Sequence, residues 1–245
     1  MINVYKTKLA YKMQLSPDVW LFGFDLPEDQ KLEFVPGQYL IMKIPQPSGD
    51  PVNRMYSIAS PSFQKQSFDI IAKLLKDGAA SEYFRNLKIG DMVEFHGPAG
   101  IFTLKDNPSD KIFLATGTGI APIRSMILSQ FHNDNEVQHN YYMFWGVRTM
   151  QDVYFLDELH VLSQKYPKFH FYICLSQETN LDAVAEEDKK KFIIGRVHKG
   201  FSSILGFMYD YDFYICGAAE VVDSLKTYLA ENNVPKTQIV SEKFV

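Results

Sequence analysis

The sequence predicts a protein of two domains, an antiparallel β-barrel over residues 1–105 and an α/β domain with a doubly wound parallel sheet over residues 106–245. Two observations carry this prediction. Short β-rich segments separated by Gly and Pro turns make up the first part of the chain, whereas strand-like and helix-like segments alternate in the second. The polar, proline-containing stretch Lys105–Asp110 lies between the two patterns and is the expected domain junction.

Segments of the first domain alternate apolar with polar residues or are rich in β-branched and aromatic residues, which favours strands. One helix is expected among them, with Tyr83, Phe84 and Leu87 on its apolar side. The expected strands are Asn3–Tyr11, Val19–Asp25, Tyr39–Ile44, Arg54–Ala59, Phe68–Lys73 and Met92–His96, and the expected helix is Ala79–Asn86.

The second domain shows strands and helices in turn, which is the order of a doubly wound sheet. The expected strands are Lys111–Ala115, Asn140–Trp145, Phe169–Leu175, Tyr211–Cys216 and Gln238–Ser241. The expected helices are Pro122–Phe131, Tyr154–Lys165, Ser202–Leu205 and Ala219–Asn232. The charged, weakly apolar stretch Thr179–Lys191 is expected to be a surface loop or a short helix.

The start of the second domain carries the first candidate site. Ile112–Ala115 is an unbroken apolar run, typical of a strand that is buried on both faces. Gly117, Thr118 and Gly119 follow as a turn that can adopt positive φ, and Pro122 fits the first turn of a helix. Such a helix start favours an anion, for example a pyrophosphate. A plain strand-to-helix turn is the alternative, because glycine motifs alone are weak signals.

This turn differs from the G-x-G-x-x-G fingerprint of dinucleotide-binding proteins. Pro122 takes the place of the third glycine. The second expected strand ends in Gly146, Val147 and Arg148, with no acidic residue to hold a ribose. The interpretation as a nucleotide site therefore depends on the rest of the chain.

Composition excludes several classes of protein. The chain has 245 residues, 46% of them apolar, and a net charge of −4 without a long basic run, which argues against a nucleic-acid surface. Its two cysteines, Cys174 and Cys216, cannot hold a Cys-ligated iron–sulfur cluster or a Cys₄ zinc site, and the histidines show no ligand spacing. No apolar run has membrane-spanning length and the N-terminus lacks a signal-peptide core, so a cytoplasmic protein is expected.

The barrel carries two further candidates. Arg54 and Tyr56 are expected on one face of a strand, with Met55 and Ser57 on the other. An Arg beside a Tyr can pair with a phosphate and offer a flat ring to a planar ligand, and an ordinary exposed strand is the alternative. Ser81 is a natural N-cap for the expected helix, and the same helix start could hold an anion.

The last candidates lie near the C-terminus. Cys216 and Gly217 end an expected parallel strand, and ligands of such sheets bind outside those strand ends. The alternative for Cys216 is a buried structural thiol, the usual fate of a free cysteine. Phe244, next to the last residue, is either a docking contact or without a role.

The order of these motifs resembles that of the ferredoxin–NADP⁺ reductase superfamily. The chain shows R-x-Y-S at Arg54–Ser57, G-x-x-S at Gly78–Ser81, G-P-x-G at Gly97–Gly100, G-T-G-x-x-P at Gly117–Pro122, then C-G and a short aromatic tail. Each motif is weak alone, but six in this order across the change of fold are a strong signal. The resemblance covers nearly the whole chain, and the compact bacterial reductases without a fused ferredoxin are most similar.

The resemblance implies FAD in the first domain and NAD(P)H as the hydride donor. Hydride would pass from nicotinamide C4 to flavin N5, which needs stacked rings and excluded water rather than a strong acid or base. For FAD it implies Arg54 at the pyrophosphate, Tyr56 on the isoalloxazine, Ser57 near N5, Gly78 and Ser81 at the phosphates, and Glu242 and Phe244 on the flavin's other side. For NAD(P)H it implies Gly117, Thr118, Gly119, Pro122, Arg148, Ser176, Gln177, Cys216 and Gly217. Ser57, Cys216 and Glu242 are the residues expected at the reacting atoms, without a metal.

Two features depart from the family's pattern. NADPH-preferring relatives carry Ser-Arg after the third strand of the second domain, where this chain has Ser176, Gln177 and Glu178. An uncharged Gln followed by a Glu that repels phosphate favours NADH, although Arg148 could still reach a 2′-phosphate. The chain ends in Phe244–Val245, whereas plant-type members end in a tyrosine that shields the flavin.

The resemblance leaves the electron acceptor open among ferredoxin, flavodoxin, an oxygenase component, a haem protein and a small molecule. Three other functions are weighed against a reductase of an acceptor protein. They are a reductase of free flavins, an electron-transfer subunit of a larger complex, and a flavin-binding sensor without turnover. The cysteine count argues against a subunit with its own iron–sulfur cluster, and the G-T-G-x-x-P and C-G motifs argue against the sensor.

Overall fold

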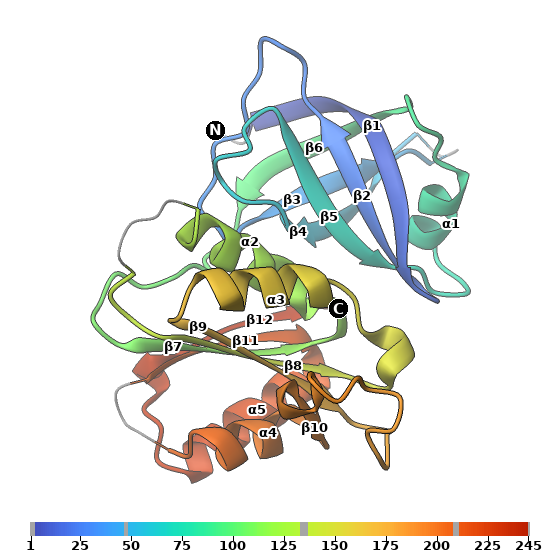
Figure 1. The fold of residues 1–245 in the computed structure, drawn as a ribbon. Helices are drawn as coiled ribbons and strands as arrows, with labels where there is room; N and C mark the ends of the chain where they lie inside the picture. The colour runs from blue at the N-terminus through green and yellow to red at the C-terminus, as the bar shows by residue number, and fades with distance from the viewer. Residues whose placement is uncertain (1–2, 47–48, 133–136, 208–210, 245) are drawn as a thin grey trace. The chain divides into compact units, whose positions relative to one another are not determined.

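The computed structural model describes residues 3–46, 49–132, 137–207 and 211–244. They form two compact units, one made of the described residues up to 104 together with 121–129, and the other of residues 105–120 together with the described residues from 130 onward. Each unit is built on a six-stranded sheet, antiparallel in the first and parallel in the second (Figure 1). The predicted fold class, an antiparallel barrel followed by a doubly wound α/β domain, is confirmed.

The antiparallel sheet has the strand order β4-β3-β6-β1-β2-β5. A bridge between Ile58 and Ile70 joins the end of β4 to β5, so the two edge strands meet and the sheet curls into a barrel. The strands are β1 (Asn3–Ser16), β2 (Val19–Asp25), β3 (Tyr39–Ile44), β4 (Val52–Ser57), β5 (Ser67–Lys73) and β6 (Met92–Ala99), and α1 (Ala79–Asn86) lies between β5 and β6.

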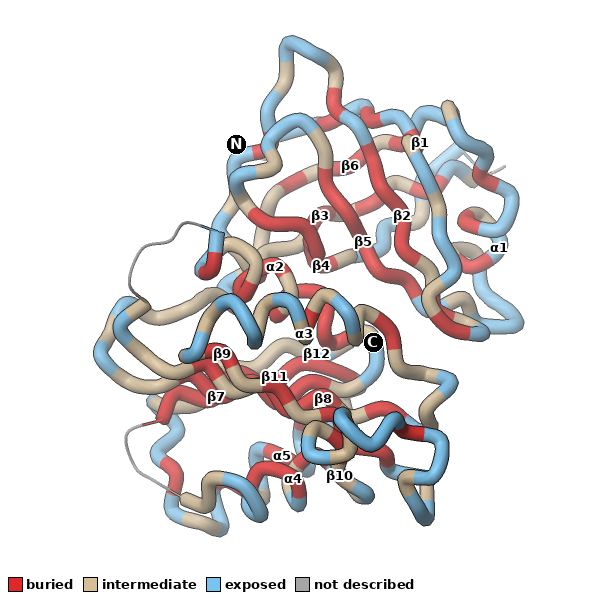
Figure 2. Tube along the Cα trace, viewed as in Figure 1, coloured by how far each residue is buried: buried red, intermediate tan, exposed pale blue. Residues whose placement is uncertain are grey.

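Alternation along the strands builds the core of the barrel. In β3, the inward residues Leu40, Met42 and Ile44 are buried while their neighbours are partly exposed (Figure 2). Aromatic rings fill the centre, and those of Phe24 and Phe95 meet edge to face with centroids 4.9 Å apart. The alternation of buried and partly exposed residues along the strands therefore explains why this part of the chain folds as a sheet around an apolar core.

The parallel sheet has the strand order β10-β9-β8-β7-β11-β12. Its strands are β7 (Asp110–Thr116), β8 (Tyr141–Val147), β9 (Phe169–Leu175), β10 (Phe192–Ile194), β11 (Tyr211–Ala218) and β12 (Ile239–Phe244). The helices of this part of the chain are α2 (Ile120–Gln130), α3 (Leu156–Lys165), α4 (Val197–Ile204) and α5 (Ala219–Glu231). The strand order reverses between β7 and β11, which makes their carboxyl ends the topological switch point where ligands of such sheets bind.

Helices cover both faces of the parallel sheet, with α4 and α5 on one face and α3 on the other (Figure 1). Phe201 of α4 and Val222 of α5 are buried against Ile112, Phe144 and Phe213 of the sheet. The central strand explains the unbroken apolar run in the sequence, because its residues 112–115 are buried on both faces.

Several strands differ from the prediction in their bounds, since β1, β6 and β12 extend to Ser16, Ala99 and Phe244. Two differences are larger. Residues 192–194 form the short edge strand β10, which the sequence did not indicate because three residues are too few for a pattern. Helix α4 begins at Val197 instead of Ser202, across Gly200, a residue that weakens helices. A Cβ at Gly200 would lie less than 3.0 Å from the sulfur of Cys174, so close packing requires glycine there.

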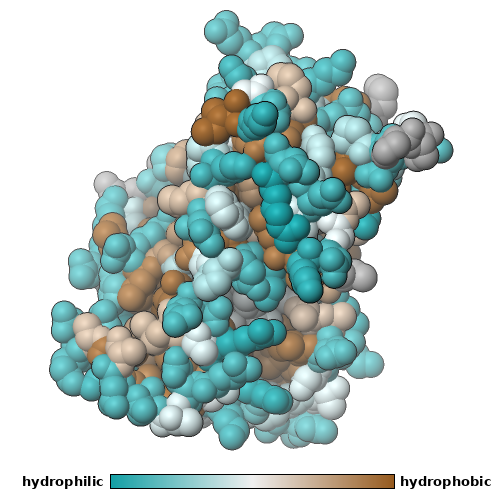
Figure 3. Space-filling model, turned by 90° about the vertical axis from the view of Figure 1, so that its right-hand side faces the viewer, coloured by the Kyte–Doolittle hydropathy of each residue, from teal (hydrophilic) through white to brown (hydrophobic). Residues whose placement is uncertain are grey.

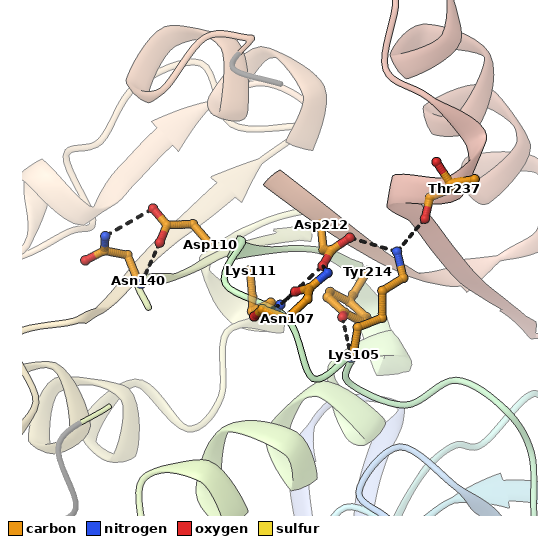
Figure 4. A network of polar contacts seen from close by, with 8 residues as sticks. All are labelled: Lys105, Asn107, Asp110, Lys111, Asn140, Asp212, Tyr214 and Thr237. Atoms are coloured by element: carbon orange, nitrogen blue, oxygen red, sulfur yellow. Dashed lines mark hydrogen bonds and ion pairs between the residues drawn. The ribbon is translucent and has the colours of Figure 1, made fainter. Parts of the chain in front are cut away.

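A network of polar side chains is buried at the amino ends of β7 and β11 (Figure 4). Lys111 and Asp212 are paired in register, each 1% exposed, and their charged groups lie 3.2 Å apart. Asp212 also accepts hydrogen bonds from Lys105 and Asn107, each at 2.7 Å. Burial alone would raise the pKa of Asp212, but these hydrogen bonds outweigh it and hold the pKa below its ordinary value. The network attaches the segment before β7 to the parallel sheet.

Among the described residues, no helix combines the length and the apolar character that crossing a membrane requires. On the face shown in Figure 3, hydrophobic side chains lie in separate groups between hydrophilic ones.

Candidate functional site

The turn between β7 and α2 has the geometry that its glycines predict. Gly117 adopts a left-handed φ of 52°, is exposed, and has no atom within 4 Å of the position that a Cβ would occupy. Gly119 serves close packing instead, because a Cβ there would lie less than 3.0 Å from the backbone of Cys216. Pro122 is the third residue of α2, within its first turn, as predicted.

The carboxyl end of β11 lies next to this turn and brings further predicted residues together. Cys216 is paired in register with Ala115 of β7 on one side and Glu242 of β12 on the other. A Cβ at Gly217 would collide with the hydroxyl of Thr116, so the chain is tightly packed here. Phe244, which the sequence marks as a candidate, lies two residues beyond Glu242 at the end of β12.

The thiol of Cys216 is buried, with 1% of the residue exposed. Burial raises the pKa of the thiol well above its ordinary value, and the carboxylate of Glu242 adds to the increase, while a hydrogen bond from the Gly217 amide opposes it. Cys216 therefore carries a neutral thiol at physiological pH rather than a reactive thiolate.

Three other predicted residues follow β8 and β9 at the same edge of the sheet. The amide and the hydroxyl of Ser176 both donate to the carbonyl of Val147, at 3.0 and 3.1 Å. The amide of Gln177 donates to the carbonyl of Arg148 at 2.9 Å. Arg148, Ser176 and Gln177 are exposed, and their backbones are adjacent. The carboxylate of Glu178 accepts a hydrogen bond from the Met150 amide at 3.1 Å.

Arg196 is a cation at this edge that the sequence analysis missed. The amide of Gly195 donates to the carbonyl of Leu175 at 2.9 Å, so Arg196 follows β10 where Ser176 follows β9. Its side chain is exposed. Strand β10, which the sequence did not predict, places Arg196 beside Ser176, so no pattern in the sequence indicated this position.

In the barrel unit, β4 carries the predicted pair of ligand-facing residues. Tyr56 lies opposite Leu40, and Arg54 lies opposite Met42. Because directly opposed residues of antiparallel strands point to the same face, Arg54 and Tyr56 share one face, as predicted. Ser57, at the end of the strand, is 6% exposed.

Tyr56 connects this strand to α1. Its ring packs edge to face on Phe84, with centroids 5.3 Å apart. Burial raises the pKa of Tyr56 to about 12, although the positive charge of Arg54 opposes the shift, so the hydroxyl stays protonated. The Arg54 side chain is exposed and donates to the carbonyl of Asn53 at 2.9 Å. Arg54 thus offers a positive charge next to a flat, partly buried ring.

The start of α1 corrects the prediction for Ser81. Gly78 is the N-cap, with φ 133° and no atom within 4 Å of a Cβ position, and no side chain caps the helix. Ser81 is the third helical residue, and its hydroxyl accepts a hydrogen bond from the Leu75 amide at 2.9 Å. Gly78 adopts a positive φ and is the N-cap, so the helix begins at Ala79, before Ser81. The first amides of α1 have no partners within the helix and point out of its end.

Residues 121–129 of helix α2 belong to the barrel unit, and side chains of this helix donate hydrogen bonds to backbone carbonyls of the barrel. The guanidinium of Arg124 donates to the carbonyl of Ala59 at 2.9 Å and lies 3.6 Å from the carboxylate of Asp69. The hydroxyl of Ser125 donates to the carbonyl of Ser60 at 2.7 Å. No sequence pattern marks these residues, because their partners are distant in the chain.

Comparison with known protein families matches both parts of the chain. Residues 6–104 match the oxidoreductase FAD-binding domain, and residues 113–227 match the oxidoreductase NAD-binding domain. A ferredoxin–NADP reductase B from Sorangium cellulosum is 29% identical over 98% of this chain and 97% of its own length. The reductase component of a propane 2-monooxygenase from Mycolicibacterium smegmatis is 28% identical over 89% of this chain. This chain spans only 61% of the length of that component.

Solved structures support the fold. A ferredoxin–NADP⁺ reductase from Neisseria gonorrhoeae, solved with FAD and NADP, superposes with a TM-score of 0.81 at 21% identity, over 99% of this chain and 98% of that one. The flavohem-like FAD/NAD-binding domain of a Vibrio cholerae nitric oxide dioxygenase gives a TM-score of 0.81 at 21% identity, over 98% of both chains.

The two units and their matches define an oxidoreductase that binds FAD and NAD(P)H. The chain belongs to the ferredoxin–NADP⁺ reductase superfamily.

Proposed function

We propose that this protein is an NAD(P)H-dependent flavoprotein reductase with FAD held by residues 1–105, NAD(P)H held by residues 106–245, and an acceptor protein as the destination of the electrons. The observation that carries the proposal is the switch point of the parallel sheet. There a left-handed glycine, a tightly packed second glycine and the Cys216-Gly217 pair meet at the start of a helix. This arrangement suits a dinucleotide whose pyrophosphate needs backbone amides at close range.

The barrel residues fit FAD. Arg54 supplies an exposed guanidinium for a phosphate, and Tyr56 beside it supplies a flat ring for the isoalloxazine. Gly78 leaves open space at the first amides of α1, where a phosphate oxygen accepts hydrogen bonds. Ser81 supports that helix start through the Leu75 amide. The roles of Ser57 near flavin N5, and of Glu242 and Phe244 on the flavin's other side, rest on the resemblance to the family.

The α/β residues fit a nicotinamide dinucleotide. The turn Gly117–Gly119 and the first turn of α2 with Pro122 would hold its pyrophosphate. Arg148, Ser176 and Gln177 would hold the adenosine end, and Cys216 and Gly217 the nicotinamide.

The flavin, when bound, supplies a two-electron acceptor that can release electrons one at a time. The chain's own residues then bind, orient and shield. Burial keeps the Cys216 thiol neutral, so it acts as a small apolar contact rather than as a nucleophile. The protonated hydroxyl of Tyr56 likewise takes no part as a base. The site thus needs no strong acid or base, in agreement with hydride transfer between positioned rings.

We further propose NADH as the preferred donor. Gln177 carries no charge where a cation would pair with a 2′-phosphate, and Glu178 adds a negative charge nearby. Arg148 and Arg196 are exposed cations at this edge that would attract a 2′-phosphate. Specificity constants (kcat/KM) measured with NADH and with NADPH show which nucleotide these opposing charges favour.

The acceptor is proposed to be a ferredoxin, a flavodoxin or an oxygenase component. One similar protein is named as a ferredoxin–NADP reductase and another as the reductase component of a propane 2-monooxygenase. Reduction of free flavins is the second candidate function, since the same FAD site would serve a flavin that is released after reduction.

Gel filtration followed by turnover assays separates the two functions. The protein is passed over the column, its FAD content is measured, and NADH oxidation is followed with ferredoxin, flavodoxin or added FMN as acceptor. We expect FAD to stay bound at one per chain and the acceptor protein to support turnover. Loss of FAD, with turnover only when free flavin is added, would favour the flavin reductase.

A further inference from the structure

The carbonyl oxygen of Gly117, in the turn before α2, is held by two aromatic side chains. The indole Nε1 of Trp145 donates to it at 2.9 Å, and the hydroxyl of Tyr154 donates to it at 3.3 Å. The amide of Ile120 also donates to this oxygen as the short turn closes. Three donors therefore meet at one carbonyl group, two of them from side chains distant in sequence.

Both aromatic donors are rigidly placed. Trp145, in β8, is 0% exposed, and Tyr154, just before α3, is 6% exposed. Their rings meet edge to face with centroids 4.6 Å apart. A buried indole N–H or tyrosine hydroxyl needs a partner, and here both use the same carbonyl.

This contact sets the direction of the neighbouring amide. In a trans peptide the C=O and N–H groups point in opposite directions, so the Thr118 amide points away from Trp145 and Tyr154. Gly117 beside it is exposed and has no described atom within 4 Å of a Cβ position, so a ligand can approach this part of the turn. Glycine alone would let this peptide rotate, because it tolerates both signs of φ.

We propose that Trp145 and Tyr154 are positioning residues for the nicotinamide dinucleotide. They hold the Gly117 carbonyl so that the Thr118 amide is presented to an oxygen of the pyrophosphate. A donor fixed in advance costs no reorganisation when the ligand binds. The inference rests on the proposed function, in which this turn binds NAD(P)H, and it assigns the two residues to binding rather than to hydride transfer.

Tyr154→Phe and Trp145→Phe test the inference, because each keeps an aromatic ring and removes one donor. We expect the KM for NADH and the inhibition constant of ADP-ribose to rise by about three- to tenfold in each variant, the loss of one hydrogen bond. In the double variant, both constants are expected to rise further than in either single variant. Because binding alone is affected, kcat and FAD content stay at the wild-type value. Inhibition by adenosine, which has no phosphate, is expected to be unchanged.

Tyr214→Phe is the matched control. It removes another buried tyrosine hydroxyl of the same unit, which accepts a hydrogen bond from the Lys105 amide at 2.9 Å. We expect wild-type KM and inhibition constants in this variant. Unchanged constants in Tyr154→Phe and Trp145→Phe, or an equal loss for adenosine and ADP-ribose, would overturn the inference. If Trp145→Phe does not fold, Tyr154→Phe decides. A wild-type protein that neither nucleotide reduces would refute the proposed function itself.

Discussion

Gly119 packs directly against the backbone carbonyl of Cys216, so that a Cβ at position 119 would lie less than 3.0 Å from three backbone atoms of residues 216 and 217. The contact joins the turn after β7 to the carboxyl end of β11 at the reversal of strand order. The atoms in contact are backbone atoms, so they cannot move aside as the end of a flexible side chain would. This packing fixes the distance between the proposed pyrophosphate and nicotinamide contacts.

Gly119→Ala is therefore expected to be more damaging than Gly117→Ala. The first forces backbone atoms apart, at a cost of about 3 kcal/mol or more in unfolding free energy. The second places an alanine at φ 52° in open space, which costs about 1–2 kcal/mol. Urea denaturation of both variants measures the difference. Equal losses would mean that the close contact with Cys216 does not exist in solution.

Arg54→Ala is expected to weaken FAD retention, because it removes a charge-assisted pair with a phosphate, worth about 1.5–3 kcal/mol. The measurement is the flavin content after gel filtration. Lys73→Ala is the control, since it removes another exposed cation of the barrel, one that pairs with Asp18 at 2.9 Å. Equal flavin content in the two variants would remove Arg54 from the proposed FAD site.

Cys216→Ala is expected to slow flavin reduction by NADH by about tenfold through misplacement of the nicotinamide, with FAD still bound. Cys174→Ala is the matched control, because Cys174 is also a buried cysteine of the parallel sheet. Since the pKa of the Cys216 thiol lies well above its ordinary value, the wild-type rate should show no thiol titration up to about pH 8.5. Equal rates in wild type and Cys216→Ala would return this residue to the role of a structural thiol.

Gln177→Arg is expected to raise kcat/KM for NADPH by about tenfold, because it adds a cation beside the proposed 2′-position. Efficiency with NADH is expected to change little. Steady-state kinetics with both nucleotides is the measurement. Gln164→Arg, at an exposed position of α3 in the same unit, controls for added charge alone. A variant with unchanged NADPH efficiency would place the 2′-position elsewhere.

Asp212→Asn is expected to cost about 3–5 kcal/mol of unfolding free energy, because it leaves the ammonium of Lys111 buried without its counter-ion. Asp223→Asn, in an exposed pair with Lys243, should cost less than about 1 kcal/mol. The folded pKa of Asp212 is depressed, so its contribution is present above the ordinary carboxyl pKa of about 3.9 and is lost as the pH falls through the lower folded value. Denaturation curves of wild type and Asp212→Asn should therefore differ at pH 7 and converge at low pH.

Local sequence patterns predicted most of the elements. The apolar run before Gly117 reflects a strand buried on both faces, and the alternation around Leu40 reflects a strand buried on one face. They failed at Ser81, where the positive φ of Gly78 decides the helix start. They could not reveal Arg196 or the Trp145 contact with Gly117, since both depend on strands that meet only in the folded sheet. Residues paired across the fold leave no periodic signal in the sequence.

Anaerobic absorbance spectroscopy of the purified protein tests the central claim most directly. The protein is mixed in a stopped-flow instrument with NADH and, separately, with NADPH, and the flavin band is followed. The account predicts a flavin spectrum that bleaches rapidly with NADH and more slowly with NADPH. A yellow protein that neither nucleotide bleaches would contradict the assignment as a reductase, and faster bleaching by NADPH would contradict the proposed preference alone.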